Sequence, residues 1–184
     1  MAPKQVKKLK IYGGEHASDI KSSMRDQIYP PFDEMSLDKT IVGLRWFTLS
    51  HACPLQLIFS DGSKSQFDQC RLPEPNLSAF WTEKKIPAGS RIRRVQMLYK
   101  KQNQNLEGLR FLCPENKLLV AVGEKDNTQW HTDPDYQLPS KEKELGLKEF
   151  TLEEGHFLVG AKSGSRNIQQ ARHFDFQFYI GFYE

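Results

Sequence analysis

The segment 129–133 brings together residue types that could do chemistry within very few positions. It reads Gln-Trp-His-Thr-Asp, and on a β-strand His131 and Asp133 would share one face, where they could bind a metal ion. The indole of Trp130 could stack on a sugar or on a nucleic-acid base. A metal site needs three or four ligands, and the sequence places no third one nearby. The alternative is a solvent-exposed loop that the tryptophan anchors, so we expect no metal.

A basic cluster is the second candidate. Its members are Arg91, Arg93, Arg94, Lys100 and Lys101. Together with the lysines of segment 4–10, it could form a patch that binds acidic protein surfaces, phosphate or RNA. The alternative is a solvated strand face. Proteins that bind single-stranded nucleic acid interleave basic side chains with exposed aromatic ones, whereas the aromatic residues here follow buried patterns. The cluster therefore favours an acidic protein partner over nucleic acid.

Catalytic motifs are missing from the sequence. It contains no glycine-rich phosphate loop, no Gly-x-Ser-x-Gly and no His-Glu-x-x-His. His51 and Cys53 could form a thiol–imidazole pair, but side chains two residues apart before Pro54 are more typical of a turn. We therefore expect a protein that is not an enzyme and that uses no cofactor.

The composition is that of an ordinary globular protein. The chain has 184 residues, a net charge of +3 and three cysteines, none of them in C-x-x-C spacing. That cysteine pattern predicts reduced thiols rather than a disulfide framework or a zinc site. The lysine-rich start lacks the apolar region of a secretory signal, and no apolar run approaches the length of a membrane span. These features predict a cytoplasmic protein without a membrane span.

The C-terminal segment 173–182 has the clearest secondary-structure pattern. Large apolar residues occupy every second position: Phe174, Phe176, Phe178, Ile180 and Phe182. Alternate side chains of a strand point to the same face, so this pattern predicts a half-buried β-strand. We expect it to be central, and its removal to abolish folding.

Three blocks of similar spacing precede or include this strand. They begin with apolar strands at Ile41, Ile92 and Leu158, and each has a second strand about 16 residues later. A repeated unit in a β-rich chain predicts one all-β domain over residues 1–184. The segment 15–38 is expected to be irregular, and 124–148 to be a long loop.

Gly13-Gly14 after a first strand, together with the blocks 41–67, 92–122 and 157–182, resembles the jacalin-like family. The resemblance implies three Greek-key-like units that close around one core and form a β-prism or a related β-sandwich. It also implies a sugar site in which backbone near the N-terminal glycines meets an aspartate of a Gly-x-x-x-Asp loop. The chain keeps Gly13 and Gly14 but has no Gly-x-x-x-Asp near its C-terminus.

Two functions follow from these observations. The first is a structural or protein-interaction module in an intracellular assembly, for which an acidic cytoskeletal surface would suit the positive charge. Long loops on a rigid β-scaffold commonly serve as binding elements. The alternative is a carbohydrate-binding lectin of the jacalin-like kind, whose site would combine Gly13 and Gly14 with the loop that carries Trp130, His131 and Asp133.

Overall fold

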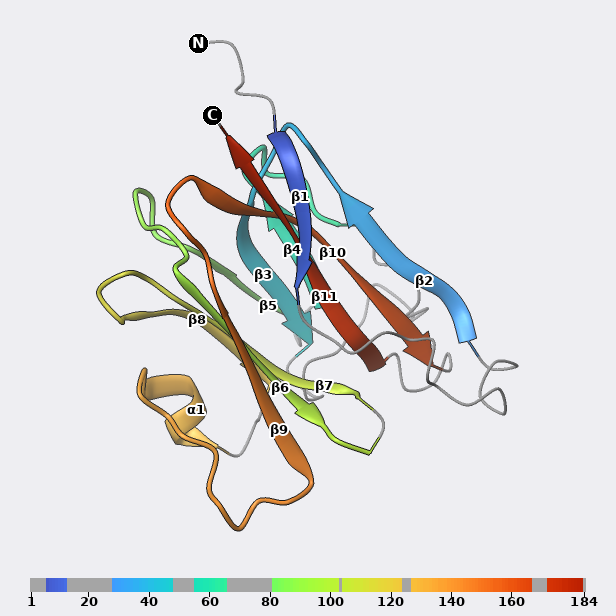
Figure 1. The fold of residues 1–184 in the computed structure, drawn as a ribbon, viewed down its shortest axis with the longest axis vertical. Coiled ribbons are helices and arrows are strands. Elements are labelled where there is room, and N and C mark those ends of the chain that lie inside the picture. Colours follow the sequence, from blue (N-terminus) through green and yellow to red (C-terminus); the bar gives the residue numbers. More distant parts are fainter. Residues whose placement is uncertain are drawn as a thin grey trace.

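A computed structural model of the protein describes residues 6–12, 28–47, 55–65, 81–102, 104–123, 127–166 and 172–183 (Figure 1). Within these ranges lie eleven β-strands and one short α-helix. The strands form three antiparallel sheets, which we call A, B and C.

Sheet C is built from one continuous part of the chain. It contains β6 (Arg94–Lys100), β7 (Leu106–Leu112), β8 (Leu118–Gly123) and β9 (Leu145–Thr151) in the order β8-β7-β6-β9. The first three strands are consecutive hairpins, and β9 returns to lie beside β6. This order is that of a Greek key.

Sheet B begins with a hairpin as sheet C does, and it has three described strands instead of four. It contains β3 (Ile41–Phe47), β4 (Leu55–Phe59) and β5 (Trp81–Lys85) in the order β4-β3-β5. Again the last strand returns to pair with the first. The β5 strand pairs with β3 from Gly43↔Lys85 to Phe47↔Trp81.

Sheet A joins the two ends of the chain. It contains β1 (Val6–Tyr12), β2 (Ile28–Met35), β10 (His156–Arg166) and β11 (Arg172–Tyr183) in the order β1-β11-β10-β2. Here β10 and β11 form the hairpin. The strand β1 lies beside β11 as β8 lies beside β7 in sheet C, and β2 lies beside β10 as β9 lies beside β6. The three blocks of the sequence therefore correspond to the three sheets.

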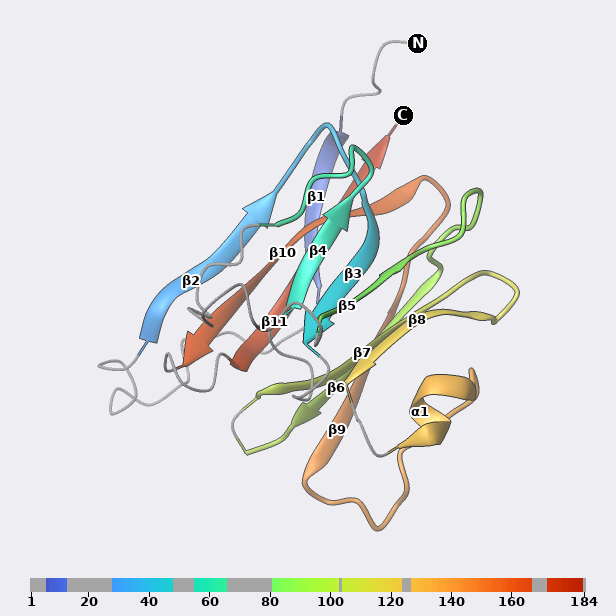
Figure 2. The ribbon, with the colours of Figure 1, turned by 180° about the vertical axis from the view of Figure 1, so that it is seen from behind.

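One apolar core lies between the sheets. Its buried members come from all three: Leu44 and Phe59 from sheet B, Val95 and Phe111 from sheet C, and Phe178 from sheet A. Three antiparallel sheets around one shared core make this fold a β-prism, which confirms the predicted fold class. The two opposite views show the three sheets around that interior (Figures 1 and 2).

The C-terminal strand is central, as its aromatic pattern predicts. In sheet A, β11 pairs with β1 on one side and with β10 on the other. Phe176, Phe178 and Ile180 are buried in the core. Phe182 is only half-buried, and its ring lies 5.2 Å from that of His156. The side chain of Phe174 lies outside the described residues.

Two expectations about irregular segments need correction. The segment 15–38 contains the strand β2, although it includes Pro30 and Pro31. Because β2 is an edge strand of its sheet, it tolerates residues that lack an N–H group. The segment 124–148 contains the helix α1 (Thr128–Thr132) and the start of β9. Its remaining described part is folded against sheet C.

Membrane-spanning helices are not found in the described part of the chain: its helix is too short to cross a bilayer.

Candidate functional site

The outer face of sheet C is covered by residues 127–145, as Figure 2 shows for α1 and the segment that follows it. Strand alternation directs Val95 and Met97 of β6 inward to the common core. The intervening residues Gln96 and Leu98 point outward, yet both are buried. A sheet face that is buried on its outer side requires a covering segment, and 127–145 supplies it.

Trp130 fixes this covering segment to the sheet. Its side chain is fully buried, and its indole N–H donates to the Val122 carbonyl at 3.0 Å. The Tyr136 ring packs edge-on against the indole with the centroids 5.6 Å apart. Leu98 and Ala121 complete a second, smaller apolar cluster. The Asn127 side chain caps α1 by accepting from the Trp130 N–H at 3.1 Å.

The indole of Trp130 packs against Gly108 of sheet C. A Cβ atom at residue 108 would stand 2.9 Å from two indole carbons of Trp130, closer than real contacts of this kind. The glycine therefore allows the tryptophan to approach the sheet so closely.

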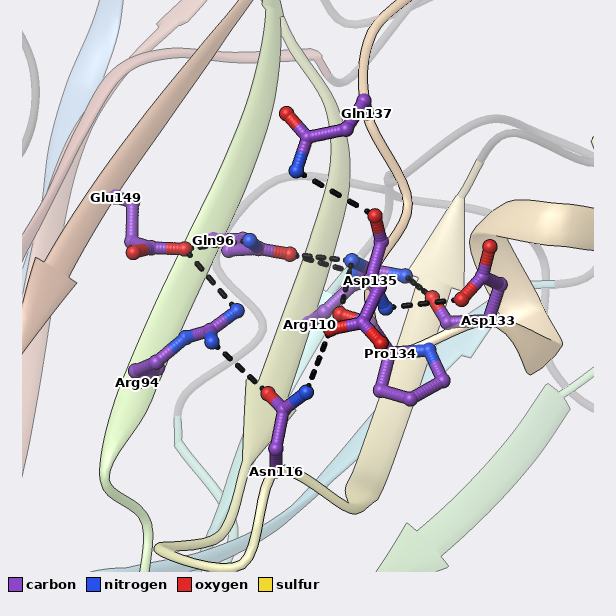
Figure 3. A network of polar contacts seen from close by, with 9 residues as sticks. All are labelled: Arg94, Gln96, Arg110, Asn116, Asp133, Pro134, Asp135, Gln137 and Glu149. Carbon is purple, nitrogen blue, oxygen red and sulfur yellow. Dashed lines mark hydrogen bonds and ion pairs between the residues drawn. The ribbon is translucent and has the colours of Figure 1, made fainter.

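Arg110 is the second anchor of the covering segment, which it contacts through its guanidinium (Figure 3), and its whole side chain is buried. The guanidinium donates through Nε to Gln96 Oε1 at 2.9 Å. It also donates through Nη1 to the carbonyls of Trp130 at 3.1 Å and Asp133 at 2.6 Å. Its carbon Cζ lies 4.5 Å from the Trp130 ring centroid. One side chain thus joins two strands and the turn after α1.

Burial lowers the pKa of Arg110, and the nearby Asp133 carboxylate acts in the opposite direction. A guanidinium has so high an ordinary pKa that it remains charged at neutral pH. The cation is stabilised by backbone carbonyls and by a neutral amide, which replace the water that it loses.

A half-exposed group of four side chains lies beside Arg110, and we call it the polar cluster. Its members are Arg94, Asn116, Asp135 and Glu149. Arg94 Nη1 donates to Asn116 Oδ1 at 2.9 Å, and Asn116 Nδ2 donates to Asp135 Oδ1 at 2.7 Å. Arg94 Nη2 lies 3.4 Å from Glu149 Oε2. The chain of contacts continues through Gln96, which donates to Glu149 and accepts from Arg110.

These contacts fix the cluster from four different parts of the chain. Arg94 comes from β6, Asn116 from the β7–β8 turn, and Glu149 from β9. Asp135 comes from the covering segment, where its own N–H donates to Asp133 Oδ1 at 2.9 Å. The position of Asp135 therefore depends on the turn that Arg110 holds.

The structure changes the interpretation of segment 129–133. Residues 128–132 form the helix α1, not a strand, so His131 and Asp133 do not share a face. His131 Nε2 lies 2.6 Å from the Gly123 carbonyl oxygen. The described residues contain no group of three or more His, Cys, Asp or Glu side chains that could hold a metal ion. Trp130 is buried, so its indole cannot stack on a ligand.

The expected basic patch is divided between different environments. Arg93 donates to the Leu152 carbonyl, and Arg94 belongs to the polar cluster. Lys100 lies at the other end of β6, where its Nζ is 3.9 Å from Glu107 Oε1. Lys100 is six positions beyond Arg94 on the same strand, which corresponds to roughly 20 Å. Arg91 lies in the β5–β6 connection. These residues, with the exposed Lys101, do not form one continuous surface.

Several residues that sequence reasoning considered lie outside the described residues. They are Lys4, Gly13, Gly14, His51, Cys53 and Cys70, together with the side chains of Lys7, Lys8 and Lys10. Cys113 is described, and it is a free, buried thiol, as the cysteine pattern predicts.

Sequence reasoning missed four of the residues that organise this site: Asn116, Asp135, Glu149 and Arg110. Arg110 could have been found from one sequence signal, which is a charged residue within the apolar segment 106–112. When the outer face of such a strand is buried, the charged side chain needs hydrogen-bond partners. Gln96 lies directly across from it in the register. The other three are ordinary polar residues until the fold brings them together.

The chain is similar to solved structures of other proteins. No family model matches the chain, and no curated protein matches it. The Vibrio cholerae biofilm matrix protein Bap1 is 14% identical with a TM-score of 0.46, and the match covers 98% of this chain. This chain spans only 24% of the length of Bap1.

Two further structures are similar over the whole chain. A mannose-binding lectin from Champedak is 10% identical with a TM-score of 0.46, and the match covers 100% of both chains. A lamprey immune protein is 13% identical with a TM-score of 0.47, and the match covers 100% of this chain and 45% of that one. At these values the similarities do not assign a family or a function.

Proposed function

We propose that the protein is a non-enzymatic carbohydrate-binding module and that the polar cluster on sheet C is its site. The observation that carries this proposal is the fixed arrangement of Arg94, Asn116, Asp135 and Glu149 by mutual hydrogen bonds at a half-exposed surface. Side chains that are ordered before the ligand arrives lose less conformational entropy on binding.

The chemistry of the cluster suits hydroxyl groups. A hydroxyl both donates and accepts a hydrogen bond, so it needs acceptors and donors close together. In the described structure, the contacts of Asp135 and Glu149 within the cluster use Oδ1 and Oε2, which leaves the second oxygen of each carboxylate for a ligand. The guanidinium and amide groups supply donors beside them. Hydrogen bonds to charged groups are stronger than neutral ones.

A glycan array tests the proposal. We expect the protein to bind at least one class of glycan, and Asp135→Asn and Glu149→Gln to weaken that binding about tenfold or more, since a hydrogen bond to a charged group contributes roughly 1.5–3 kcal/mol. Glu154→Gln is the matched control, because Glu154 is an exposed carboxylate outside the cluster. Absence of glycan binding, or equal losses in the control, would contradict the proposal.

A second candidate is the protein-interaction module in an intracellular or cytoskeletal assembly. It is favoured by two large exposed apolar side chains, Met35 at the end of β2 and Leu37 in the connection to β3, which are 40% and 45% exposed. Adjacent exposed apolar residues are common where proteins bind one another. Affinity purification from native cells with the wild type and Leu37→Ser tests this candidate. A partner that both proteins capture equally would argue against this surface.

A further inference from the structure

A pocket of about 250 Å³ lies at one end of the prism, where segments from all three sheets meet. The start of β3, the β5–β6 connection and the start of β10 line it. Its floor consists of core residues that are almost fully buried: Ile41, Ile92, Leu152 and Leu158. The pocket therefore opens directly onto the apolar interior, and it shares no residue with the polar cluster.

The rim of the pocket is a short, well-defined turn. The Ser90 N–H donates to the Pro87 carbonyl at 2.9 Å, and Gly89 has φ near +81°, a conformation that glycine adopts without strain. The Ile86 N–H donates to the Val42 carbonyl at 2.7 Å, which fixes the turn to β3. A rim held by backbone hydrogen bonds keeps the opening in place without a ligand.

Arg91 gives the pocket a positive charge. Arg91 lines it, and its Nε is buried without a hydrogen-bond partner in the described structure. Buried N–H groups are nearly always paired, so an unpaired one is a place where an incoming acceptor is favoured. The imidazole of His156 also lines the pocket, and its ring packs against that of Phe182. Among the residues that the structure describes, the lining includes neither aspartate nor glutamate, and Glu153 Oε2 lies 3.8 Å from His156 Nε2 outside the lining.

We infer that this pocket binds a small organic monocarboxylate whose apolar body lies on the aliphatic floor and whose carboxylate accepts from Arg91. The volume sets the size of the ligand. An apolar cavity of about 150 Å³ is large enough for benzene, and drug-sized ligands occupy pockets of roughly 300–1,000 Å³. A pocket between these sizes suits a chain or ring system of about ten carbon atoms.

Isothermal titration calorimetry with decanoate, below its micelle concentration, tests the inference. We expect saturable binding with a stoichiometry near one, and about tenfold to hundredfold weaker binding for Arg91→Gln, as for the loss of a charge-assisted hydrogen bond. Lys101→Gln removes the same charge from an exposed site at the other end of β6 and should bind as the wild type does. Decylammonium should bind at least tenfold more weakly than decanoate.

A second variant separates loss of the site from loss of the fold. Val42→Phe places a larger side chain at the lining of the pocket while keeping the backbone contact to Ile86. It should abolish decanoate binding and leave the circular dichroism spectrum unchanged. Undetectable binding to the wild type, equal affinity in Arg91→Gln, or undiminished binding in a folded Val42→Phe would each overturn the inference.

Discussion

The two faces of sheet C are both buried, but by different means. The inner face contributes Val95, Met97 and Phe111 to a core that all three sheets share. The outer face buries Gln96 and Arg110 under a single covering segment, which is held by one tryptophan and one guanidinium. The burial of the inner face thus depends on many non-directional apolar contacts. The burial of the outer face depends on a few specific contacts of Trp130 and Arg110.

This difference has a functional consequence. Apolar burial has no direction, so it fixes the fold without fixing any particular polar group. Hydrogen bonds have directions, and those of Arg110 place the turn that carries Asp135. We therefore expect substitutions on the inner face to affect the whole protein, and substitutions on the outer face to affect mainly the covering segment and the polar cluster.

The largest effect is expected on the inner side, from Phe178→Ala. The ring of Phe178 is fully buried and packs against Phe111 and Phe176, with centroids 5.9 and 5.1 Å apart. Removing a buried phenyl ring should lower the free energy of unfolding by about 3–5 kcal/mol. Urea unfolding monitored by fluorescence measures it. A loss below about 1 kcal/mol would show that the three sheets do not share one essential core.

A smaller and more local effect is expected from Arg110→Met. The substitution leaves the Gln96 oxygen and the carbonyls of Trp130 and Asp133 without their buried donor. We expect a loss of about 2–3 kcal/mol, since each unsatisfied buried group costs roughly 1–3 kcal/mol and the turn can partly open to water.

Hydrogen exchange distinguishes a local from a global effect of that substitution. Amides of 127–136 should lose protection in Arg110→Met while those of β11 keep it. Lys117→Met, at an exposed position on the β7–β8 turn, is the control. Uniform loss of protection throughout the chain would remove the distinction between the two faces.

Gly108→Ala should have an effect of about 1–3 kcal/mol, the usual cost of overpacking. The added methyl group would stand 2.9 Å from the indole of Trp130. In a Trp130→Leu background the same substitution should cost less, because the clash is then relieved, and a double-mutant cycle measures that coupling. Strict additivity would show that Trp130 does not press against residue 108.

The smallest effect is expected at an exposed polar contact in the turn that follows β4 of sheet B. Hydrogen bonds from Ser63 lower the pKa of Asp61 below its ordinary value of 3.8. A lowered pKa means that the stabilisation is present above the ordinary value and is lost as the pH falls through the folded value. Asp61→Asn should therefore be slightly less stable at pH 7, and the difference should vanish in strong acid. A difference that persists there would contradict the assignment.

The inner face could be predicted from the sequence because its signal is local. Alternation of apolar residues in 173–182 is sufficient to define a strand and the face that it buries. The alternation of Phe176, Phe178 and Ile180 is seen in the structure as burial in the core. The edge strand β2 was missed because prolines normally argue against a strand, and its edge position depends on pairing with β10, far along the chain.

The outer face could not be predicted in the same way. Trp130 and Gly108 are distant in sequence, and nothing near either residue indicates that the indole packs on that glycine. The sequence predicted a loop that includes 129–133, where the Asn127 cap instead starts a helix. The polar cluster requires four elements to come together, so its members have no shared local pattern.

The most direct test of the account is a nuclear magnetic resonance titration of the labelled protein with the glycan that binds best on the array. We predict that the largest amide shifts lie at the polar cluster, near residues 94–96, 116, 133–137 and 149, and that Asp135→Asn removes them. Shifts centred on Gly13 and Gly14, or on Met35 and Leu37, with none at the cluster would contradict it.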